Sequence, residues 1–141
     1  MRRILLAGLA MLLVACGGDK ATGPNPVSGN YALQTVNGNN VPAVYFQDPS
    51  VKFEIVSGSF NIVGDNTWNG TFTLRGTDLT TGGVSTVTPP VGGTYALNNG
   101  SITLTDGRNG LTFTGTLAGG TLTVGSDAFV DGETTSLVFR K

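Results

Sequence analysis

The chain has no histidine and a single cysteine, Cys16, among its 141 residues. A disulfide within the chain needs a second cysteine, and the common zinc sites and Cys/His nucleophiles need histidine partners. An intermolecular disulfide is the one such use of this thiol that remains open. We therefore expect no enzymatic activity, no catalytic residues, no metal and no cofactor.

Charged residues are also few, at 12% of the chain, with eight Lys and Arg against nine Asp and Glu. Binding to nucleic acid needs clustered positive charge that neutralises phosphates, and the sequence has no basic stripe. The acidic residues lie mostly in expected turns, where Asp side chains accept hydrogen bonds from nearby backbone amides. The composition therefore indicates no nucleic-acid partner and gives little support for acid–base catalysis.

The chain also lacks an apolar run of about 20 residues, the length that a membrane-spanning helix needs. The apolar run at residues 4–14 is shorter than this, with Arg2 and Arg3 before it and the small Ala15 after it. This layout is typical of a secretory signal peptide. We expect residues 1–15 to form a signal helix that is removed from the mature protein.

The sequence "LVAC", which ends at Cys16, resembles the lipobox of bacterial lipoproteins. The resemblance implies a diacylglyceryl group on the Cys16 sulfur, cleavage before this residue, and acylation of the new amine. Several acyl chains would hold the protein on a membrane, because each buried methylene contributes about 0.8 kcal/mol. Residues 16–28 would then be the acylated cysteine and a flexible linker rich in Gly, Pro and Asn. Gly17, where an aspartate would favour the inner membrane, points to the outer membrane of a cell envelope.

What the chain does have, from residue 29 onward, is large apolar residues that alternate with polar ones, many of them threonine. Phe72 and Leu74, for example, alternate with Thr71 and Thr73. A period of two with β-branched polar residues on the opposite face predicts half-buried antiparallel strands. Turn sequences such as "NNG" and "DGRNG" separate the runs. The expected strands are residues 30–36, 51–57, 59–64, 67–76, 84–88, 93–98, 101–105, 110–117, 120–125 and 135–140.

These strands predict an all-β fold for residues 29–141. We expect an antiparallel up-and-down meander barrel of eight to ten short strands, because closure removes exposed sheet edges. Gly58 is expected either as a turn between two strands or as a bulge within one. Residues 88–93, "TPPVGG", are expected at an edge, a bulge or a loop, because Pro89 and Pro90 cannot donate to a β-ladder.

Two short motifs at the ends of this region carry a resemblance to a known family. "SGNYALQTVNG" contains Gly29-x-Tyr31, and "SLVFRK" contains Arg140. The chain resembles small bacterial lipoproteins of the lipocalin-like (calycin-type) group, although lipocalins have a tryptophan where Tyr31 stands. The resemblance implies an eight-stranded barrel in which Arg140 of the last strand packs over Tyr31 of the first. Such stacking would contribute about 0.5–2 kcal/mol, and a solvated Arg140–Lys141 pair is the alternative.

The interior of a small closed barrel is either filled by side chains or holds one small ligand. The sequence leaves both alternatives open, with a solid or nearly solid core slightly favoured. A cavity of about 300 Å³ or more would favour a ligand. The expected interior residues are Leu33, Phe53, Ile55, Phe60, Ile62, Trp68, Phe72, Leu74, Tyr95, Leu97, Ile102, Leu104, Leu111, Phe113, Leu122, Leu137 and Phe139.

Four residues are candidates for contact with such a ligand. Val44, Tyr45 and Phe46 lie in residues 37–50, a segment expected to form the loop over the barrel mouth. They would act either as a lid on a ligand or as a plug that closes the barrel. Trp68 follows a turn and would lie either at the mouth or in the core.

The function expected from these features is that of a monomeric, lipid-anchored envelope lipoprotein that binds a small apolar or amphipathic ligand. The alternative is a structural or interaction lipoprotein with a solid barrel core, which contacts other envelope proteins.

Overall fold

The computed structural model describes residues 27–130 and 132–141. Within them the fold is all-β, with eleven strands. Cys16 and the expected signal peptide and most of the expected linker lie outside the described residues. The strands are β1 (Gly29–Val36), β2 (Asn39–Asn40), β3 (Ala43–Gln47), β4 (Val51–Ile62), β5 (Thr67–Asp78), β6 (Val84–Val87), β7 (Pro90–Asn98), β8 (Ser101–Asp106), β9 (Thr112–Ala118), β10 (Thr121–Val130) and β11 (Glu133–Arg140).

Eight of these strands form a closed antiparallel barrel, as the alternating pattern predicted. The barrel order is β1, β11, β10, β9, β8, β7, β5 and β4, and β4 pairs with β1 to close the ring. Strand β1 is therefore hydrogen-bonded on both sides, to β4 through Gly29–Ala32 and to β11 beyond them. Strands β7 to β11 follow one another as an uninterrupted meander. The architecture is consistent with a lipocalin-like barrel.

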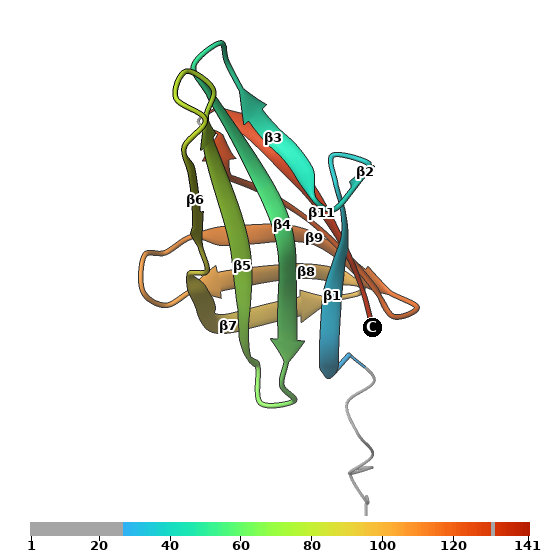
Figure 1. Cartoon of the computed structure of the whole chain (residues 1–141). Coiled ribbons are helices and arrows are strands. Elements are labelled where there is room, and N and C mark those ends of the chain that lie inside the picture. Colours follow the sequence, from blue (N-terminus) through green and yellow to red (C-terminus); the bar gives the residue numbers. More distant parts are fainter. Residues whose placement is uncertain (1–26, 131) are drawn as a thin grey trace, which may run out of the picture.

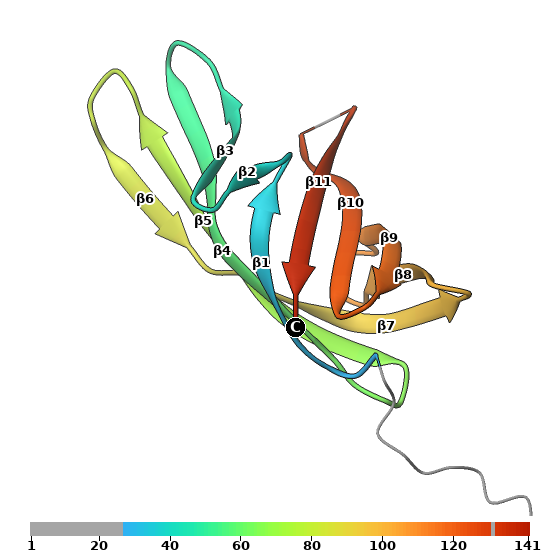
Figure 2. The same ribbon diagram turned by 90° about the vertical axis from the view of Figure 1, so that its right-hand side faces the viewer.

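The three remaining strands extend the barrel at one end. Strand β2 pairs with β1, β3 pairs with the first half of β4, and β6 pairs with the second half of β5. We call the four-stranded extension the flap; it consists of β3, residues 51–55, residues 74–78 and β6. Figures 1 and 2 show that the flap projects beyond the rest of the barrel, at the end opposite the β4–β5 turn.

Of the two alternatives expected at Gly58, the structure has the single strand: residues 51–62 form β4 in the long β4–β5 hairpin, and the strands 51–57 and 59–64 are not separated by a turn. The pairing of β4 with β5 shifts between Ile55 and Ser57, so the irregularity lies one step before Gly58 and no turn forms there. Gly58 is paired with Phe72, and a Cβ at position 58 would lie 2.9 Å from the Phe72 ring. The glycine is there because the interior has no room for a side chain.

The proline pair marks the point at which β5 changes partner. Residues 67–71 of β5 pair with β7, and residues 74–77 pair with β6. Pro89 lies between β6 and β7, and its carbonyl accepts a hydrogen bond from the Phe72 amide at 3.3 Å. Pro90 is the first residue of β7. Residues 90–93 pair with β5, but the ladder with β8 begins only at Gly93, so residues 90–92 lie at an edge of the β7–β8 pairing, which was one of the expected positions. A proline is tolerated at the first position of a strand because its missing N–H interrupts no established ladder.

The part of the barrel beyond the flap, which we call the lower barrel, is filled by an aromatic cluster centred on Phe60, which is 0% exposed. Its ring centroid lies 4.4 Å from that of Phe139, 5.0 Å from Trp68, 5.3 Å from Phe113 and 5.5 Å from Phe72. These are stacked and edge-to-face separations at which aromatic pairs attract. The barrel below the flap is therefore a packed core.

Burial agrees with most of the expected interior residues and departs at a few. Phe53, which was expected inside, is 38% exposed because it lies in the flap. Leu97 and Leu111 are half-buried, as is Leu74. Tyr31 and Val36 of β1 are fully buried although they were not among the expected interior residues.

Candidate functional site

An apolar pocket of about 450 Å³ lies where the packed core ends and the flap begins. We call it the mouth pocket. Its walls come from elements far apart in the chain: β3 and β5 on the flap side, β9 and β10 across from them, and the two turns that flank β7 and β8. The apolar side chains include Tyr45, Phe72, Leu74, Leu111, Phe113 and Phe129.

Tyr45 and Phe129 bring the two walls of the mouth pocket together. The Tyr45 ring meets the Phe129 ring edge-on at 5.6 Å, and Phe129 meets Phe72 of the core at 5.4 Å. Burial raises the pKa of the Tyr45 phenol above its usual value of 10.0, so the ring remains neutral at physiological pH. The floor of the pocket is thus continuous with the aromatic core.

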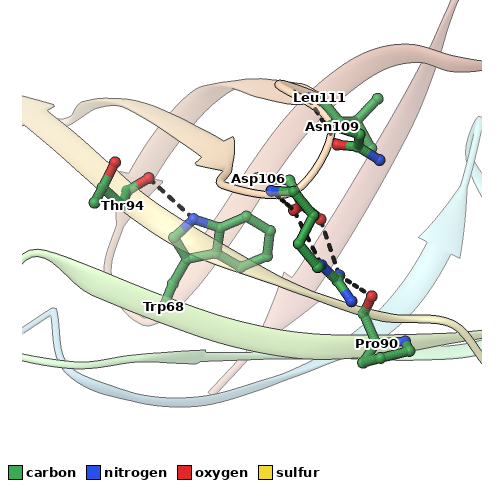
Figure 3. A network of polar contacts seen from close by, with 7 residues as sticks. Trp68, Pro90, Thr94, Asp106, Asn109 and Leu111 are labelled. Carbon is green, nitrogen blue, oxygen red and sulfur yellow. Dashed lines mark hydrogen bonds and ion pairs between the residues drawn. The ribbon is translucent and has the colours of Figure 1, made fainter.

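The charged residues of the pocket are Asp106 and Arg108, at the turn between β8 and β9. Asp106 is 1% exposed. Its Oδ1 accepts hydrogen bonds from the backbone N–H and the Nε of Arg108, at 2.8 and 3.3 Å, and its Oδ2 accepts one from Nη2 at 3.1 Å. The Arg108 guanidinium also donates to the carbonyl of Pro90 (Figure 3). Hydrogen bonding to Arg108 lowers the pKa of the Asp106 carboxyl below its usual 3.8.

The polar groups that remain available to a ligand here are donors. The Asp106 carboxylate is occupied by Arg108, and the Asn109 Oδ1 accepts from the Leu111 amide at 2.9 Å (Figure 3). No contact within the described residues engages Nη1 of Arg108 or the side-chain NH₂ of Asn109. Half of the Arg108 side chain is exposed. A ligand in the mouth pocket would therefore present apolar surface to the walls and a hydrogen-bond acceptor to these donors.

Of the residues expected over the barrel mouth, the structure places Tyr45 in the pocket wall. Val44 and Phe46 flank it and are 40% and 37% exposed, outside the mouth pocket. The segment 37–50 was expected to be a loop, but residues 39–40 and 43–47 form β2 and β3. The pairing of β3 with β4 shifts between Val44 and Phe46, and this bulge hides the period of two from sequence reasoning.

Trp68 lies in the packed core rather than in the mouth pocket. It is 2% exposed, and its indole N–H donates a hydrogen bond to the Thr94 carbonyl at 3.0 Å (Figure 3). Its ring packs edge-on against Phe60. Of the two positions expected for Trp68, the structure has the core position, and the residue is left out of the candidate site.

The first and last strands are adjacent, as the motif at Tyr31 and Arg140 implied. Alternation, however, places Arg140 outside the barrel, paired with Ala32, and leaves it exposed. The cation over the Tyr31 ring belongs to Lys141, whose Nζ is 6.0 Å from the ring centroid and donates to the Ser28 carbonyl at 2.5 Å. The expected contact of Arg140 with Tyr31 is thus replaced by one from the next residue.

Asp106, Arg108 and Phe129 were not singled out from the sequence as site residues. One signal was present for Asp106, since "SITLTD" places Ile102, Leu104 and Asp106 on the same face of one strand. A carboxylate that continues a buried apolar alternation needs a partner. Phe129 gave no such signal, because the β10–β11 pairing is irregular between Ser126 and Val130.

No protein-family model matches the chain, and searches of curated proteins and of solved structures return no significant match. Within residues 27–130 and 132–141, no three His, Cys, Asp or Glu side chains are grouped so that they could hold a metal ion. The same residues contain no helix that is long and apolar enough to span a membrane.

Proposed function

We propose that this protein is a monomeric, lipid-anchored envelope lipoprotein that binds a small apolar or amphipathic ligand in the mouth pocket. The observation that carries the ligand-binding part is the pocket itself. Its volume of about 450 Å³ falls within the range of small-molecule sites, roughly 300–1,000 Å³. Its lining, mostly apolar with a few polar groups at one side, also has the usual composition of such sites.

The anchor rests on the sequence around Cys16. The lipobox-like "LVAC" follows an apolar run with two arginines before it, and nothing else in the chain offers that thiol a partner. The outer membrane of a cell envelope is the proposed location.

A non-enzymatic role is favoured by the state of the charged groups at the pocket. A general base near neutral pH needs a raised carboxyl pKa, whereas Arg108 lowers that of Asp106. The carboxylate oxygens are also engaged by Arg108. The pair is therefore suited to shaping and closing the pocket wall rather than to proton transfer.

The alternative function, a structural or interaction lipoprotein, draws its support from the flap. The lower barrel is packed solid, and exposed apolar side chains such as Val84 and Val87 lie on β6, at the free edge of the flap. Exposed apolar surface of this kind is typical of contact sites. This alternative predicts an envelope protein partner and no small-molecule binding.

Titration with a fluorescent apolar probe tests the proposed pocket. The Ala128→Trp variant fills the pocket from an exposed position on β10, and Ala118→Trp is the matched control at an exposed position outside it. We expect the wild type and Ala118→Trp to bind the probe equally, and Ala128→Trp to lose at least about tenfold, or about 1.4 kcal/mol. Equal binding by all three would remove the mouth pocket as the site, and no binding by any would favour the interaction role.

The anchor is tested by Cys16→Ser with envelope fractionation and palmitate labelling of cells. We expect the variant to lose both the label and its association with membranes. A variant that keeps both would disprove the lipoprotein assignment while leaving the pocket result untouched.

A further inference from the structure

The apolar surface of the molecule is concentrated in the flap. Among the described residues, the exposed large apolar side chains all lie in the flap or in the turn between β5 and β6. Val84 is 64% exposed and Val87 is 55% exposed, and both lie on β6, which among the described strands pairs with β5 alone. The set is Val44, Phe46, Phe53, Leu79, Val84 and Val87.

Two further hollows continue the mouth pocket along the flap. The first, of about 230 Å³, shares Tyr45 and Leu74 with the mouth pocket. The second, of about 420 Å³, shares Phe53, Gly76 and Ser85 with the first. Because each hollow shares wall residues with the next, the three adjoin in a row along the flap from Arg108 to the β5–β6 turn, and we call this row of hollows the flap groove.

The floor of the flap groove depends on small residues beside Phe53. Phe53, Gly76 and Ser85 lie opposite one another on β4, β5 and β6. A Cβ at position 76 would lie 3.0 Å from the Phe53 ring, so a larger side chain would stand in the groove or displace the ring. The groove follows β5 from Phe72 to Asp78, a length of about 20 Å at about 3.3 Å per residue.

The polar ends of the flap groove differ in what they offer a ligand. At the mouth, Nη1 of Arg108 and the side-chain amide of Asn109 are donors that no contact within the described residues engages. At the far end, Oδ1 of Asp78 already accepts from the backbone amides of Thr80 and Thr81, at 2.8 and 3.1 Å. An amphiphile would therefore bind with its acceptor head at Arg108 and its apolar chain toward the β5–β6 turn.

We infer that the ligand is a single-chain acyl amphiphile whose acceptor head meets Arg108 and whose chain lies in the flap groove. This inference rests on the proposed function and specifies its ligand class. A chain longer than the mouth pocket can hold would extend over the other two hollows of the flap. A free fatty acid and a lysophospholipid both have this chemistry.

The test is chain-length dependence, measured by displacement of the fluorescent apolar probe with octanoate and palmitate. We expect the wild type to bind palmitate at least about a hundredfold more tightly than octanoate, because each added buried methylene contributes about 0.8 kcal/mol. Gly76→Val should reduce palmitate affinity at least about tenfold, about 1.4 kcal/mol, and leave octanoate affinity unchanged. Thr86→Val, nearly isosteric and on the other face of the flap, is the control and should bind both as the wild type does.

A second variant protects the test against a folding defect. Ser85→Leu fills the same part of the groove from the exposed strand β6, and it should lower palmitate affinity as Gly76→Val does. Comparison of palmitate with its lysophospholipid ester distinguishes the two sources of the chain, since both carry the same chain with different heads. The ligand that binds more tightly shows which head group the site prefers. Both ligands should bind Gly76→Val more weakly than they bind the wild type.

Three results would overturn the inference. The first is equal loss of octanoate and palmitate in Gly76→Val, and the second is absence of chain-length dependence in the wild type; both leave the mouth pocket as the site. The third is a wild-type dimer in sedimentation velocity that palmitate does not dissociate and that Ser85→Leu disrupts, which would make the flap an interface between copies. Failure of the proposed function is separate, because then the probe itself fails to bind or is insensitive to Ala128→Trp.

Discussion

Strands β4 and β5 pass through two environments, the packed barrel and the flap. Both halves carry apolar residues on the same face, but other strands cover this face only in the barrel half. In the barrel half, Phe60 is 0% exposed and Phe72 is 2% exposed. In the flap half, Phe53 lies on the same face of the sheet, beyond the shift in pairing between Ile55 and Ser57, and is 38% exposed. The difference arises because the barrel half faces β9 and β11 across the interior, whereas the flap half faces no strand over most of its length (Figure 2).

The comparison shows that one hydrophobic pattern can serve two purposes within one hairpin. Full burial of a large apolar side chain contributes about 1.5–3 kcal/mol, so the barrel half supplies stability. The flap half leaves part of that free energy unrealised, and this makes it available to a ligand. The predictions below test the division between a barrel that supplies stability and a flap for which we propose a binding role.

Removal of an aromatic ring should have its largest effect in the barrel. Phe60→Ala deletes the ring at the centre of the cluster and should lower the free energy of unfolding by about 3–5 kcal/mol. Phe53→Ala removes the same group from the flap and should cost about 1 kcal/mol or less. Urea denaturation followed by tryptophan fluorescence measures both. Similar losses in the two variants would show that the flap is as much a part of the core as the barrel.

Replacement of a carboxylate should lower stability more at the rim of the barrel than at the tip of the flap. Asp106→Asn removes the buried carboxylate that accepts the hydrogen bonds of the half-exposed Arg108 and should destabilise the fold by about 1–3 kcal/mol. Asp78→Asn affects hydrogen bonds within the β5–β6 turn and should leave global stability nearly unchanged. Thermal unfolding at neutral pH compares the two.

The same carboxylate contributes to the pH dependence of stability, beside the other carboxyl groups whose pKa values are lowered, Asp48, Glu54, Asp65 and Asp78. The pKa of Asp106 is lower in the folded protein than its usual 3.8, so the folded state binds fewer protons than the unfolded state in this range. The stabilisation is therefore complete above about pH 4 and is lost as the pH falls through the folded-state pKa. Asp106→Asn should show a smaller loss of stability between pH 4 and acid denaturation. If this variant lost as much stability at low pH as the wild type, the contribution assigned to Asp106 would be wrong.

The smallest effect is expected at the barrel end opposite the flap. A double-mutant cycle with Tyr31→Leu and Lys141→Met should give a coupling free energy of about 0.5–1 kcal/mol, because the Lys141 ammonium lies over the ring near the surface. The same cycle with Arg140→Ala should give no coupling with Tyr31. Coupling to Arg140 instead would restore the contact that the family resemblance implied.

The barrel was predictable because alternation dominates its strands. "SITLT" and "TLTV" place one apolar residue at every second position, and only an antiparallel sheet buries such a face. The adjacency of the first and last strands was predictable from the motif at Tyr31 and Arg140. The exact cation was not, since the parity of the last strand decides whether Arg140 or Lys141 reaches the ring.

The site was less predictable, for reasons visible in particular residues. Tyr45 was identified from its apolar neighbours, but the bulge in β3 concealed the strand that positions it. Phe53 was expected inside because a sequence does not reveal which half of a long hairpin other strands will cover. The donors of Arg108 reach the pocket through a local turn held by Asp106, but the hydrogen bond from Arg108 to the Pro90 carbonyl, 18 residues away, is a tertiary contact that the sequence does not reveal.

The placement of β1 has a mechanical consequence for an anchored protein. Gly29 begins β1 at the barrel end opposite the flap, beside the β4–β5 turn (Figure 1). A pull on a tether at this end would act along β1, which β4 holds on one side and β11 on the other. Such a pull along β1 would load in shear the β4 ladder at Gly29–Ala32 and, behind it, the β11 ladder from Ala32 onward. The strand nearest the proposed anchor is thus held by two ladders that resist a pull along its length, and the flap groove lies at the opposite end of the barrel.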